Sequence, residues 1–291
     1  MNSIEQRFQL KGKTALVTGA SSGLGVYFAE VLAAAGATVI VTARRVDRLD
    51  ALTEKINNSG GKAVTMPCDV SDGDSVTKLM NDSWEQCGGV DILVNNAGIV
   101  DSPFASERLP NQEFESVLQT NLNGVWYCCR EAGARMLSQP AGGSIINITS
   151  VLGMGGAIDH PVGYQVSKAG VINLTRNLAC SWADRKVRVN AIAPAYFPSE
   201  MTGPYFEVPG YTEFVNEATP MGRTGELSEL AGPLLLLASD AGTYITGITI
   251  PVDGGYSASV GQSRWNEDIY AGLSELNPEG MKKIRPEGSS E

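Results

Sequence analysis

Residues 14–25 read TALVTGASSGLG, an apolar run of strand-forming residues followed directly by a glycine-rich turn. We predict a strand over Thr14–Thr18 and a helix over about Leu24–Ala35, which Gly36 closes because glycine tolerates the left-handed conformation at a helix end. A strand, a tight turn and a helix in this order bring the free N–H groups of the helix start against an anion such as a pyrophosphate. The stretch therefore favours a dinucleotide-binding loop, although glycines alone would indicate no more than a tight turn.

The rest of the chain alternates short apolar runs with longer helical stretches. Short, almost continuously apolar strands are typical of a parallel sheet whose two faces are both covered by helices. We therefore predict an α/β fold, a single Rossmann-like, doubly wound parallel sheet of seven strands with helices on both faces, which binds ligands at the carboxyl ends of its strands. The further strands are expected at Thr38–Ala43, Ala63–Cys68, Asp91–Asn95, Ser144–Thr149, Val187–Ala193 and Gly247–Val252, and two long helices at Glu113–Met136 and Gly163–Trp182.

Composition and charge exclude several classes of function. The chain has 22 lysines and arginines against 32 aspartates and glutamates, a net charge of -10. Such an acidic chain repels a phosphate backbone, so we expect no nucleic-acid partner. No apolar run suits a secretory signal or a membrane span, so we expect no membrane association and a cytoplasmic location. The five cysteines are irregularly spaced, which fits free thiols better than a disulfide framework or a metal site, and we expect no bound metal.

Further motifs follow the glycine loop in a fixed order. TGxxxGxG at 18–25 is followed by NNAG at 95–98, TNLNG at 120–124, a serine at 150, YxxxK at 164–168, VNAIAP at 189–194 and VDGG at 252–255. In this series the chain resembles the compact form of the short-chain dehydrogenase/reductase family, over about residues 10–256. YxxxK by itself arises often by chance, whereas the whole ordered series does not.

The resemblance implies a catalytic group of Asn121, Ser150, Tyr164 and Lys168. A tyrosine with a pKa of about 10 is a poor base at neutral pH, and a nearby cation lowers that pKa by stabilising the phenolate. Tyr164 and Lys168 are four residues apart on a predicted helix, so they share one face. By resemblance, Ser150 holds the substrate oxygen, Lys168 also bonds the nicotinamide ribose, and Asn121 secures a proton-relaying water. Taken singly, each residue has an ordinary structural explanation, such as a packed ring or a strand-end cap.

The end of the second predicted strand bears on the choice of nicotinamide cofactor. It reads TARR, with Arg44 and Arg45 where an NAD-binding fold usually offers a carboxylate to the ribose. A planar guanidinium makes paired charge-assisted bonds to phosphate, so we expect NADP(H), with Arg44 as the first contact and Arg45 as the second. Two solvated arginines are the alternative, and Ser22 stands where NADP-using relatives often carry a basic residue. The full set of expected cofactor contacts is Gly19, Ser21, Ser22, Gly23, Leu24, Gly25, Arg44, Arg45, Asp69, Val70, Asn96, Ala97, Gly98, Tyr164, Lys168, Pro194, Phe197 and Ser199.

We predict one domain with an extension at each end. Residues 1–9 form an N-terminal extension, residues 10–256 the catalytic domain and residues 257–291 a polar tail. Within the domain, residues 195–226 interrupt the alternation for so long that we expect a substrate-binding loop. The many aromatic residues of this 195–226 segment suggest an apolar or ring-containing substrate, or serve only to fasten the loop to the domain.

The chain departs from the family pattern in two places. Ala195 follows Pro194 where the family usually has glycine, and a positive φ there would cost an alanine about 1 kcal/mol. Ser150 and Tyr164 are 14 residues apart, one more than in many relatives. We therefore expect the backbone to differ locally at both places.

Three functions remain open. The first is an oxidoreductase that transfers a hydride between NADP(H) and a ketone or secondary alcohol, working as a carbonyl reductase with Tyr164 as the proton donor. The second is an NAD-dependent alcohol dehydrogenase, which Arg44 and Arg45 weigh against. The third is a non-catalytic dinucleotide-binding regulator, which the complete catalytic group weighs against. By resemblance, the partners are a small carbonyl or alcohol and further copies of the chain in a homotetramer or homodimer, with the helices Glu113–Met136 and Gly163–Trp182 at one interface.

Overall fold

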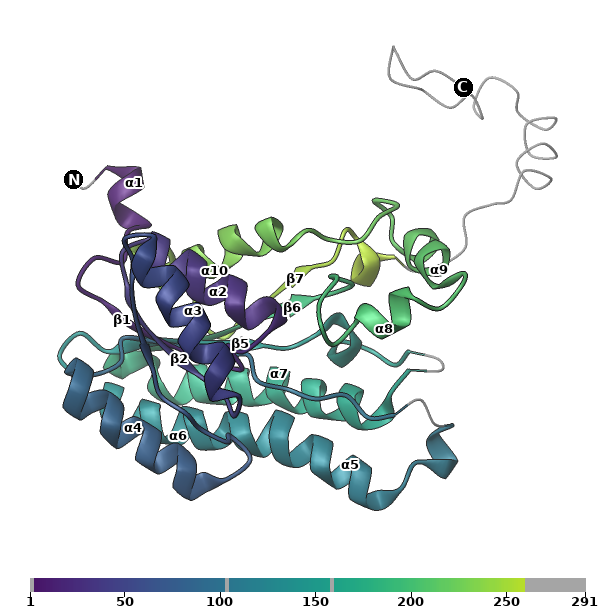
Figure 1. Cartoon of the computed structure of the whole chain (residues 1–291), viewed down its shortest axis with the longest axis horizontal. Helices are drawn as coiled ribbons and strands as arrows, with labels where there is room; N and C mark the ends of the chain where they lie inside the picture. Colours follow the sequence, from purple (N-terminus) through teal and green to yellow (C-terminus); the bar gives the residue numbers. More distant parts are fainter. Residues whose placement is uncertain (1–2, 103–104, 158–159, 260–291) are drawn as a thin grey trace, which may run out of the picture.

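Seven parallel strands form one sheet in the order β3-β2-β1-β4-β5-β6-β7 (Figure 1). The computed structural model describes residues 3–102, 105–157 and 160–259. The strand order reverses between β1 and β4, so the carboxyl ends of these neighbours border the crevice where doubly wound sheets bind ligands. The strands are β1 (Thr14–Thr18), β2 (Thr38–Thr42), β3 (Lys62–Thr65), β4 (Ile92–Asn95), β5 (Gly143–Ile148), β6 (Val187–Pro194) and β7 (Thr249–Val252).

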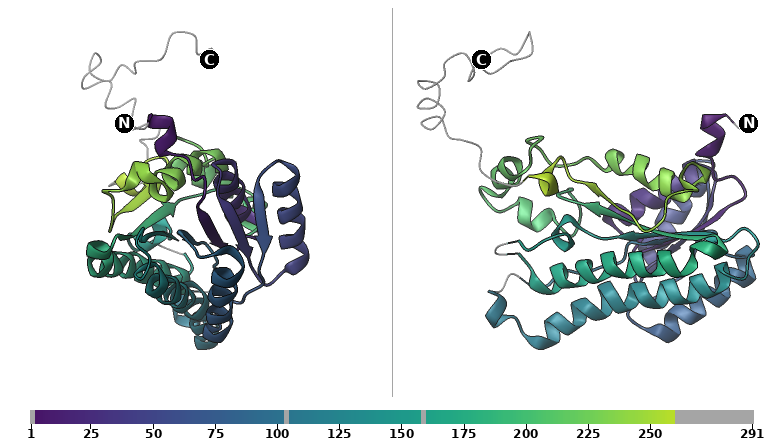
Figure 2. Two further views of the ribbon diagram at one scale, coloured as in Figure 1. Left: turned by 90° about the vertical axis from the view of Figure 1, so that its left-hand side faces the viewer. Right: turned by 180° about the vertical axis from the view of Figure 1, so that it is seen from behind.

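Helices cover both faces of this sheet (Figure 2). On one face α2, α3 and α10 share a buried cluster with Ala15 and Val17 of β1, and on the other α4, α6 and α7 share one with Leu16. Successive side chains of a strand point to opposite faces, which is why a continuous apolar run serves both clusters. The helices are α1 (Ile4–Arg7), α2 (Gly23–Ala34), α3 (Val46–Asn58), α4 (Gly73–Cys87), α5 (Asn111–Leu118), α6 (Gly124–Met136), α7 (Val162–Trp182), α8 (Gly203–Phe206), α9 (Tyr211–Ala218) and α10 (Ala231–Ala238).

The predicted fold class is confirmed, and the corrections concern element ends. The helix expected over Glu113–Met136 begins earlier, at Asn111, and a π-helical turn over Gln119–Asn123 separates α5 from α6. Single π turns inside α-helices often mark functional sites, and this one carries the buried Asn121. The third and seventh strands are shorter than predicted, because β3 ends at Thr65 and β7 begins at Thr249.

The 195–226 segment is not the plain loop that the sequence predicted. It contains α8 and α9, which lie at the opposite end of the molecule from α1 (Figure 1). Its aromatic rings pack on one another around Tyr211. The ring of Tyr211 lies 5.4–6.5 Å, centroid to centroid, from those of Tyr196, Tyr205, Phe206 and Phe214. The aromatic residues therefore pack mostly within the segment. Tyr196 also packs on the Tyr256 ring at 5.5 Å, outside the segment, and this contact supports the second explanation, that such residues fasten the segment to the domain.

The two predicted extensions differ in how much of them the structure describes. The N-terminal extension contains α1, which Ser3 caps through its side chain and backbone. Of the predicted tail, residues 257–259 are described, and the first two of them belong to a short 3-10 turn, Tyr256–Ala258. Residues 260–291 lie outside the described part of the chain.

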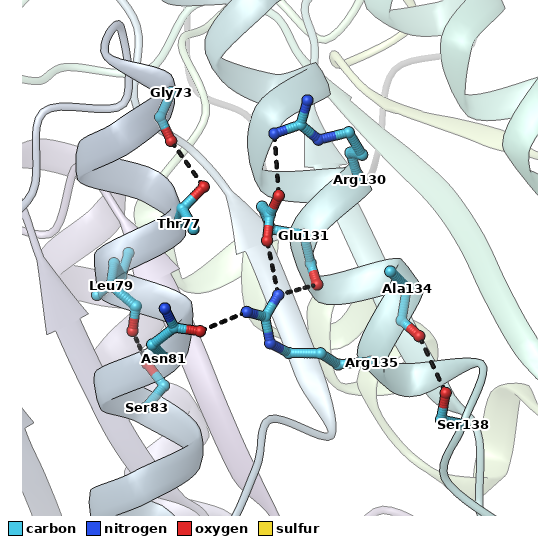
Figure 3. A network of polar contacts seen from close by, with 10 residues as sticks. All are labelled: Gly73, Thr77, Leu79, Asn81, Ser83, Arg130, Glu131, Ala134, Arg135 and Ser138. Atoms are coloured by element: carbon cyan, nitrogen blue, oxygen red, sulfur yellow. Dashed lines mark hydrogen bonds and ion pairs between the residues drawn. The ribbon is translucent and has the colours of Figure 1, made fainter.

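A polar network joins α4 to α6 (Figure 3). Arg135 donates to the Glu131 carboxylate at 2.7 Å on its own helix and to the Asn81 side-chain oxygen at 2.6 Å on α4. The same guanidinium lies 5.6 Å from the centroid of the Trp84 ring. These contacts hold α6 against α4.

The packing of α6 against the end of α7 generates a stability prediction. A Cβ added at Gly133 would lie 2.5 Å from a ring carbon of Trp182, so we expect Gly133→Ala to lower the free energy of unfolding by about 1–3 kcal/mol, as overpacked sites do. The matched control is Gly73→Ala at the start of α4. A Cβ added there would lie at an ordinary distance of 3.9 Å from the ring of Tyr127 on α6. Urea titration of both variants checks this, and equal stability of the two would contradict the packing argument.

Candidate active site

A cavity of about 600 Å³ runs along the carboxyl ends of the strands, from the glycine loop to Tyr164. Every expected cofactor contact except Gly25 lines it, as does Ser150. Gly25 lies behind the loop, where an added Cβ would stand 2.3 Å from the Gly19 carbonyl oxygen. Asn121 is fully buried beside the cavity. Its other lining residues are Ala43, Cys68, Ile99, Val100, Thr120, Ile148, Thr149, Ala195, Glu200, Met201 and Thr202.

The floor of the cavity is a close contact between the glycine loop and the turn after β4. The Thr18 hydroxyl accepts hydrogen bonds from the N–H groups of Asn96 and Ala97 at 3.0 and 3.1 Å. The Asn96 side chain donates to the carbonyl oxygens of Thr18 and Gly19. Gly19 has φ +67, and a Cβ there would lie 2.7 Å from the Ala97 Cα, so only glycine fits. No side chain caps the N-terminus of α2, which leaves its first N–H groups for an anion in the cavity.

The two arginines after β2 have different surroundings. Arg44 is 71% exposed, and its guanidinium makes a long ion pair of 3.9 Å with Asp69. Arg45 is held by several bonds: it donates to the hydroxyls of Ser21 and Ser22 at 3.0 and 2.8 Å and to the Glu200 carboxylate at 2.6 Å. Both arginines are at the mouth of the cavity, at the end opposite Tyr164.

Tyr164 and Lys168 meet at the inner end of the cavity. Both stand on α7, one turn apart, and the Lys168 Nζ lies 5.4 Å from the centroid of the Tyr164 ring. Lys168 is only 4% exposed, and its Nζ donates a hydrogen bond to the Ile148 carbonyl oxygen at 2.8 Å. Ser150 follows β5, and its side chain lies close enough to the Tyr164 phenol to lower its pKa. The structure thus brings together three of the four residues that the sequence proposed as catalytic.

Asn121 reaches the same place from the π turn. Its side-chain amide accepts a hydrogen bond from the Ile99 N–H at 2.8 Å and donates one to the Ile99 carbonyl oxygen at 2.8 Å. It also donates to the Ser167 hydroxyl. A Cβ added at Gly98 would lie 3.3 Å from the Asn121 Oδ1 and 3.6 Å from the Lys168 Nζ. Both polar groups therefore border the small space above Gly98.

Burial controls protonation of the Tyr164–Lys168 pair. Loss of hydration raises the pKa of Tyr164 above its ordinary value, and the nearby Ser150 side chain offsets part of that rise. Burial also lowers the pKa of Lys168 to about 8. The sequence predicted that Lys168 would lower the pKa of Tyr164; in this structure burial raises that pKa, and the opposing effect comes from Ser150. At neutral pH Tyr164 is a protonated phenol, the form that donates a proton to an oxygen.

Sequence reasoning missed Asp101, which holds the helix that carries Tyr164. Pro161 occupies the N-cap position of α7 and makes no side-chain cap. The buried Asp101 carboxylate, from the loop after β4, accepts from the N–H groups of Gly163 and Tyr164 at 2.9 Å each. It satisfies two of the N–H groups that every helix start leaves open. An aspartate some sixty positions before the helix gives no local capping signal, which explains why the sequence did not reveal it.

The two departures from the family pattern have local outcomes. Ala195 is not in the left-handed region, because Lys186 is the one non-glycine residue with positive φ in the described part of the chain. The Ala195 N–H donates to the Val252 carbonyl oxygen at 3.1 Å. After Ser150 the backbone forms a short 3-10 turn, Val151–Gly153, which the Ser150 hydroxyl caps by accepting from Leu152. Ala195 therefore carries no strain of the kind that a positive φ would cause, and residues 158–159 of the longer loop lie outside the described part of the chain.

The N-terminal half of the 195–226 segment closes the cavity from above. The Thr202 hydroxyl donates to the Phe197 carbonyl oxygen at 2.7 Å and accepts from the Ser199 N–H at 2.9 Å, which builds a tight turn. A Cβ added at Gly23 would lie 3.4 Å from the Ser199 Cβ, so this turn faces the glycine loop closely. The Tyr196 hydroxyl pairs with the His160 ring at 3.0 Å and ties the segment to the loop before α7.

Two searches of the described residues concern other kinds of site. Among residues 3–102, 105–157 and 160–259, histidine, cysteine and acidic side chains form no group of three that could hold a metal ion. In that same part of the chain no helix is both long and apolar enough to cross a membrane.

Comparison with known proteins agrees with this geometry. The family model described as enoyl-(acyl carrier protein) reductase matches residues 19–257. The 3-oxoacyl-(acyl-carrier-protein) reductase of Aquifex aeolicus is 39% identical over 249 residues, 85% of this chain and 98% of the relative. The chain belongs to the short-chain dehydrogenase/reductase family. It is therefore a member of a family of oxidoreductases.

Other members of the short-chain dehydrogenase/reductase family match a similar share of the chain. The galactitol 2-dehydrogenase (L-tagatose-forming) of Cereibacter sphaeroides is 38% identical over 253 residues, 86% of this chain and 97% of that relative. A solved gluconate 5-dehydrogenase from Burkholderia cenocepacia, in complex with NADP and tartrate, superposes with a TM-score of 0.85 at 30% identity, covering 89% of this chain and 100% of the other. Relatives with such different names show the family and leave the substrate open.

Removal of the Asp101 carboxylate is expected to disturb Tyr164. Asp101→Ala leaves two N–H groups unpaired, so we expect a loss of about 1–3 kcal/mol in the free energy of unfolding and at least about a tenfold fall in turnover, because the phenol moves. Asp101→Asn keeps one acceptor oxygen, so its stability and its turnover should lie between those of the wild-type protein and Asp101→Ala. The control is Asp72→Ala, which removes the side-chain cap of α4. It should cost stability and leave turnover unchanged; equal turnover in the Asp101 and Asp72 variants would contradict the assignment.

Burial of Lys168 gives a second, pH-dependent prediction. Below about pH 8 the folded chain holds a buried ammonium at Lys168, and its lost hydration lowers the free energy of unfolding. Between pH 8 and 10.5 the folded state has released this proton and the unfolded state still retains it, so the free energy of unfolding rises with pH over this range. Lys168→Met should therefore abolish turnover and raise the melting temperature at pH 7 by about 2–4 °C, and the gain should shrink toward pH 10. Lys78→Met, at an exposed site on α4, should show no such pH-dependent gain. Calorimetry across this pH range checks both variants, and a lower melting temperature for Lys168→Met at pH 7 would contradict the account.

Proposed function

We propose that the protein is an NADP(H)-dependent oxidoreductase that transfers a hydride between the cofactor and a ketone or secondary alcohol. One observation carries this proposal: a single cavity joins the glycine loop and Arg44 at one end to Tyr164, Ser150 and Lys168 at the other. A dinucleotide has its phosphates and its reacting ring at opposite ends, and this cavity offers anion-binding N–H groups and a proton donor at the corresponding ends. The residues present therefore fit such a cofactor.

The chain's own residues supply the proton and position the oxygen. A bound nicotinamide cofactor supplies the hydride. Tyr164, protonated at neutral pH because burial raises its pKa, donates its phenolic proton to the carbonyl oxygen of the substrate. Ser150, whose side chain lies beside that phenol, holds the oxygen next to it. The Lys168 ammonium stabilises the phenolate that remains, and Asn121 secures a water that returns a proton from solvent.

Arg44 supports NADP(H) over NAD(H). Its exposed guanidinium and its long pair with Asp69 leave its donors available to a phosphate on the adenosine ribose. Arg45 and the Ser22 hydroxyl lie beside it and complete a positive, hydrogen-bonding corner. NADPH is commonly kept reduced in cells, so carbonyl reduction is the proposed direction.

The apolar part of the cavity lining supports an apolar or ring-containing substrate. Ile99, Val100, Phe197 and Met201 face the cavity, whereas most aromatic rings of the 195–226 segment pack on each other. We further propose a cytoplasmic enzyme without nucleic-acid, metal or membrane partners. Its assembly would be a homotetramer or homodimer that uses α5, α6 and α7, as the family resemblance implies.

The test measures oxidation of NADPH and of NADH over a panel of aromatic and aliphatic ketones, with Tyr164→Phe beside the wild-type protein. We expect turnover with NADPH that falls at least about a thousandfold in the variant, because the proton donor is lost. Arg44→Ala should raise the KM for NADPH about tenfold or more and leave the KM for NADH nearly unchanged.

The other outcomes separate the competing functions. Preference for NADH in the wild-type protein would replace the proposal with an NAD-dependent alcohol dehydrogenase, with the same catalytic residues. Tight dinucleotide binding without turnover on any ketone or alcohol would favour the non-catalytic regulator. Full activity of Tyr164→Phe would contradict the catalytic assignment itself.

A further inference from the structure

A carboxylate from the 195–226 segment joins the two rims of the cavity. Glu200 pairs with Arg45 at 2.6 Å and with Arg48, which stands in the first turn of α3. Arg45 in turn donates to the hydroxyls of Ser21 and Ser22 in the glycine loop. A continuous chain of charged and polar groups therefore runs from the glycine loop, through Arg45, to the segment on the far side of the cavity mouth.

We propose that Glu200 retains the dinucleotide in the cavity by closing this ion-paired bridge across its mouth. The inference rests on the proposed function, since it takes the cavity to hold a nicotinamide dinucleotide. Glu200 acts here as a positioning residue: it touches the arginines of one rim and fixes the turn that covers the cavity, so a bound dinucleotide leaves only after the bridge opens.

Hydrogen bonds within the turn that carries Glu200 fix the backbone of that turn. Thr202 bonds both the Phe197 carbonyl oxygen and the Ser199 N–H, and the Gly203 N–H donates to the Ser199 carbonyl oxygen at 2.7 Å. The carboxylate therefore projects from an ordered turn, so little conformational entropy is lost when it meets the arginines. An isolated exposed ion pair contributes little, but a carboxylate shared by two arginines on a fixed turn forms a small network.

The contacts of the three neighbouring arginines indicate that Glu200 retains the dinucleotide and does not compete with its phosphate for an arginine. Arg45 and Arg48 face Glu200, whereas Arg44 pairs loosely with Asp69 and is 71% exposed. A phosphate on the adenosine ribose can be met by Arg44 without breaking the bridge. If Glu200 instead occupied a phosphate position, its removal would tighten NADPH binding alone, so the two interpretations predict opposite changes.

The test measures dissociation rates of NADPH and NADH from the full-length protein by stopped-flow fluorescence, each chased with excess oxidised dinucleotide. Glu200→Gln is expected to speed the release of both about three- to tenfold, as for the loss of a small exposed charge network. Arg48→Gln removes one of the two ion pairs of the bridge without touching the cavity lining and leaves the pair of Glu200 with Arg45. It should therefore speed release by a smaller factor than Glu200→Gln, and adding it to Glu200→Gln should change little further. Raising the salt concentration should shrink the difference between wild type and Glu200→Gln.

The matched control is Glu229→Gln. Glu229 pairs with Arg223 at 2.7 Å with similar exposure, but both lie outside the cavity, so dinucleotide release should not change. Unchanged release from Glu200→Gln would overturn the proposal, and so would slower release of NADPH alone, which would assign Glu200 as a competitor of the phosphate. Failure of the wild-type protein to bind either dinucleotide would instead contradict the proposed function, and the two failures are thus distinguishable.

Discussion

The contact between the glycine loop and the turn after β4 constrains everything else in the site. The two turns approach so closely that Gly19 and Gly25 have no room for a side chain, and Thr18 and Asn96 bond across the gap. This contact exists only because β1 and β4 are neighbours where the strand order reverses. It places the start of α2, with its open N–H groups, at the edge of the cavity.

The same contact extends to Tyr164 through six residues of chain. The strand β4 ends at Asn95, and residues 96–101 run from the glycine loop to Asp101 at the start of α7. Asn121 holds the middle of this stretch by both backbone groups of Ile99. The cofactor floor and the Tyr164 backbone are therefore parts of one connected structure, and a shift in either is transmitted to the other.

The site is costly to build, and its backbone contacts offset much of that cost. A lysine with 4% exposure loses most of its hydration, which is why burial lowers its pKa to about 8. The Ile148 carbonyl oxygen accepts one of its hydrogen bonds, so the charge is not isolated. The buried Asn121 amide is likewise satisfied by backbone and by Ser167. Such an arrangement lowers stability in exchange for a cation beside the phenol, the trade-off expected at an active site.

Sequence reasoning recovered features with a local or ordered signal. Apolar runs between helical stretches predicted the sheet, and the motif series predicted where Ser150, Tyr164 and Lys168 meet. Asp101 and Glu200 escaped it, because each acts on partners at least sixty positions away and neither lies in a motif. Their roles follow from the folded arrangement of loops, which no periodicity of the sequence encodes.

The 195–226 segment shows why composition alone misleads about a binding surface. Its aromatic residues suggested an apolar or ring-containing substrate, yet the rings of Tyr211 and its neighbours pack on each other. Ring pairs of this kind are stabilising in themselves, so an aromatic-rich segment can fold as a small cluster of its own. That cluster gives α8 and α9 a fixed position, and the ordered turn that precedes them holds Glu200 toward the arginines. Other apolar side chains line the cavity instead, among them Ile99, Val100, Phe197 and Met201, and the first two of these come from the same loop after β4 whose Asp101 holds the start of α7.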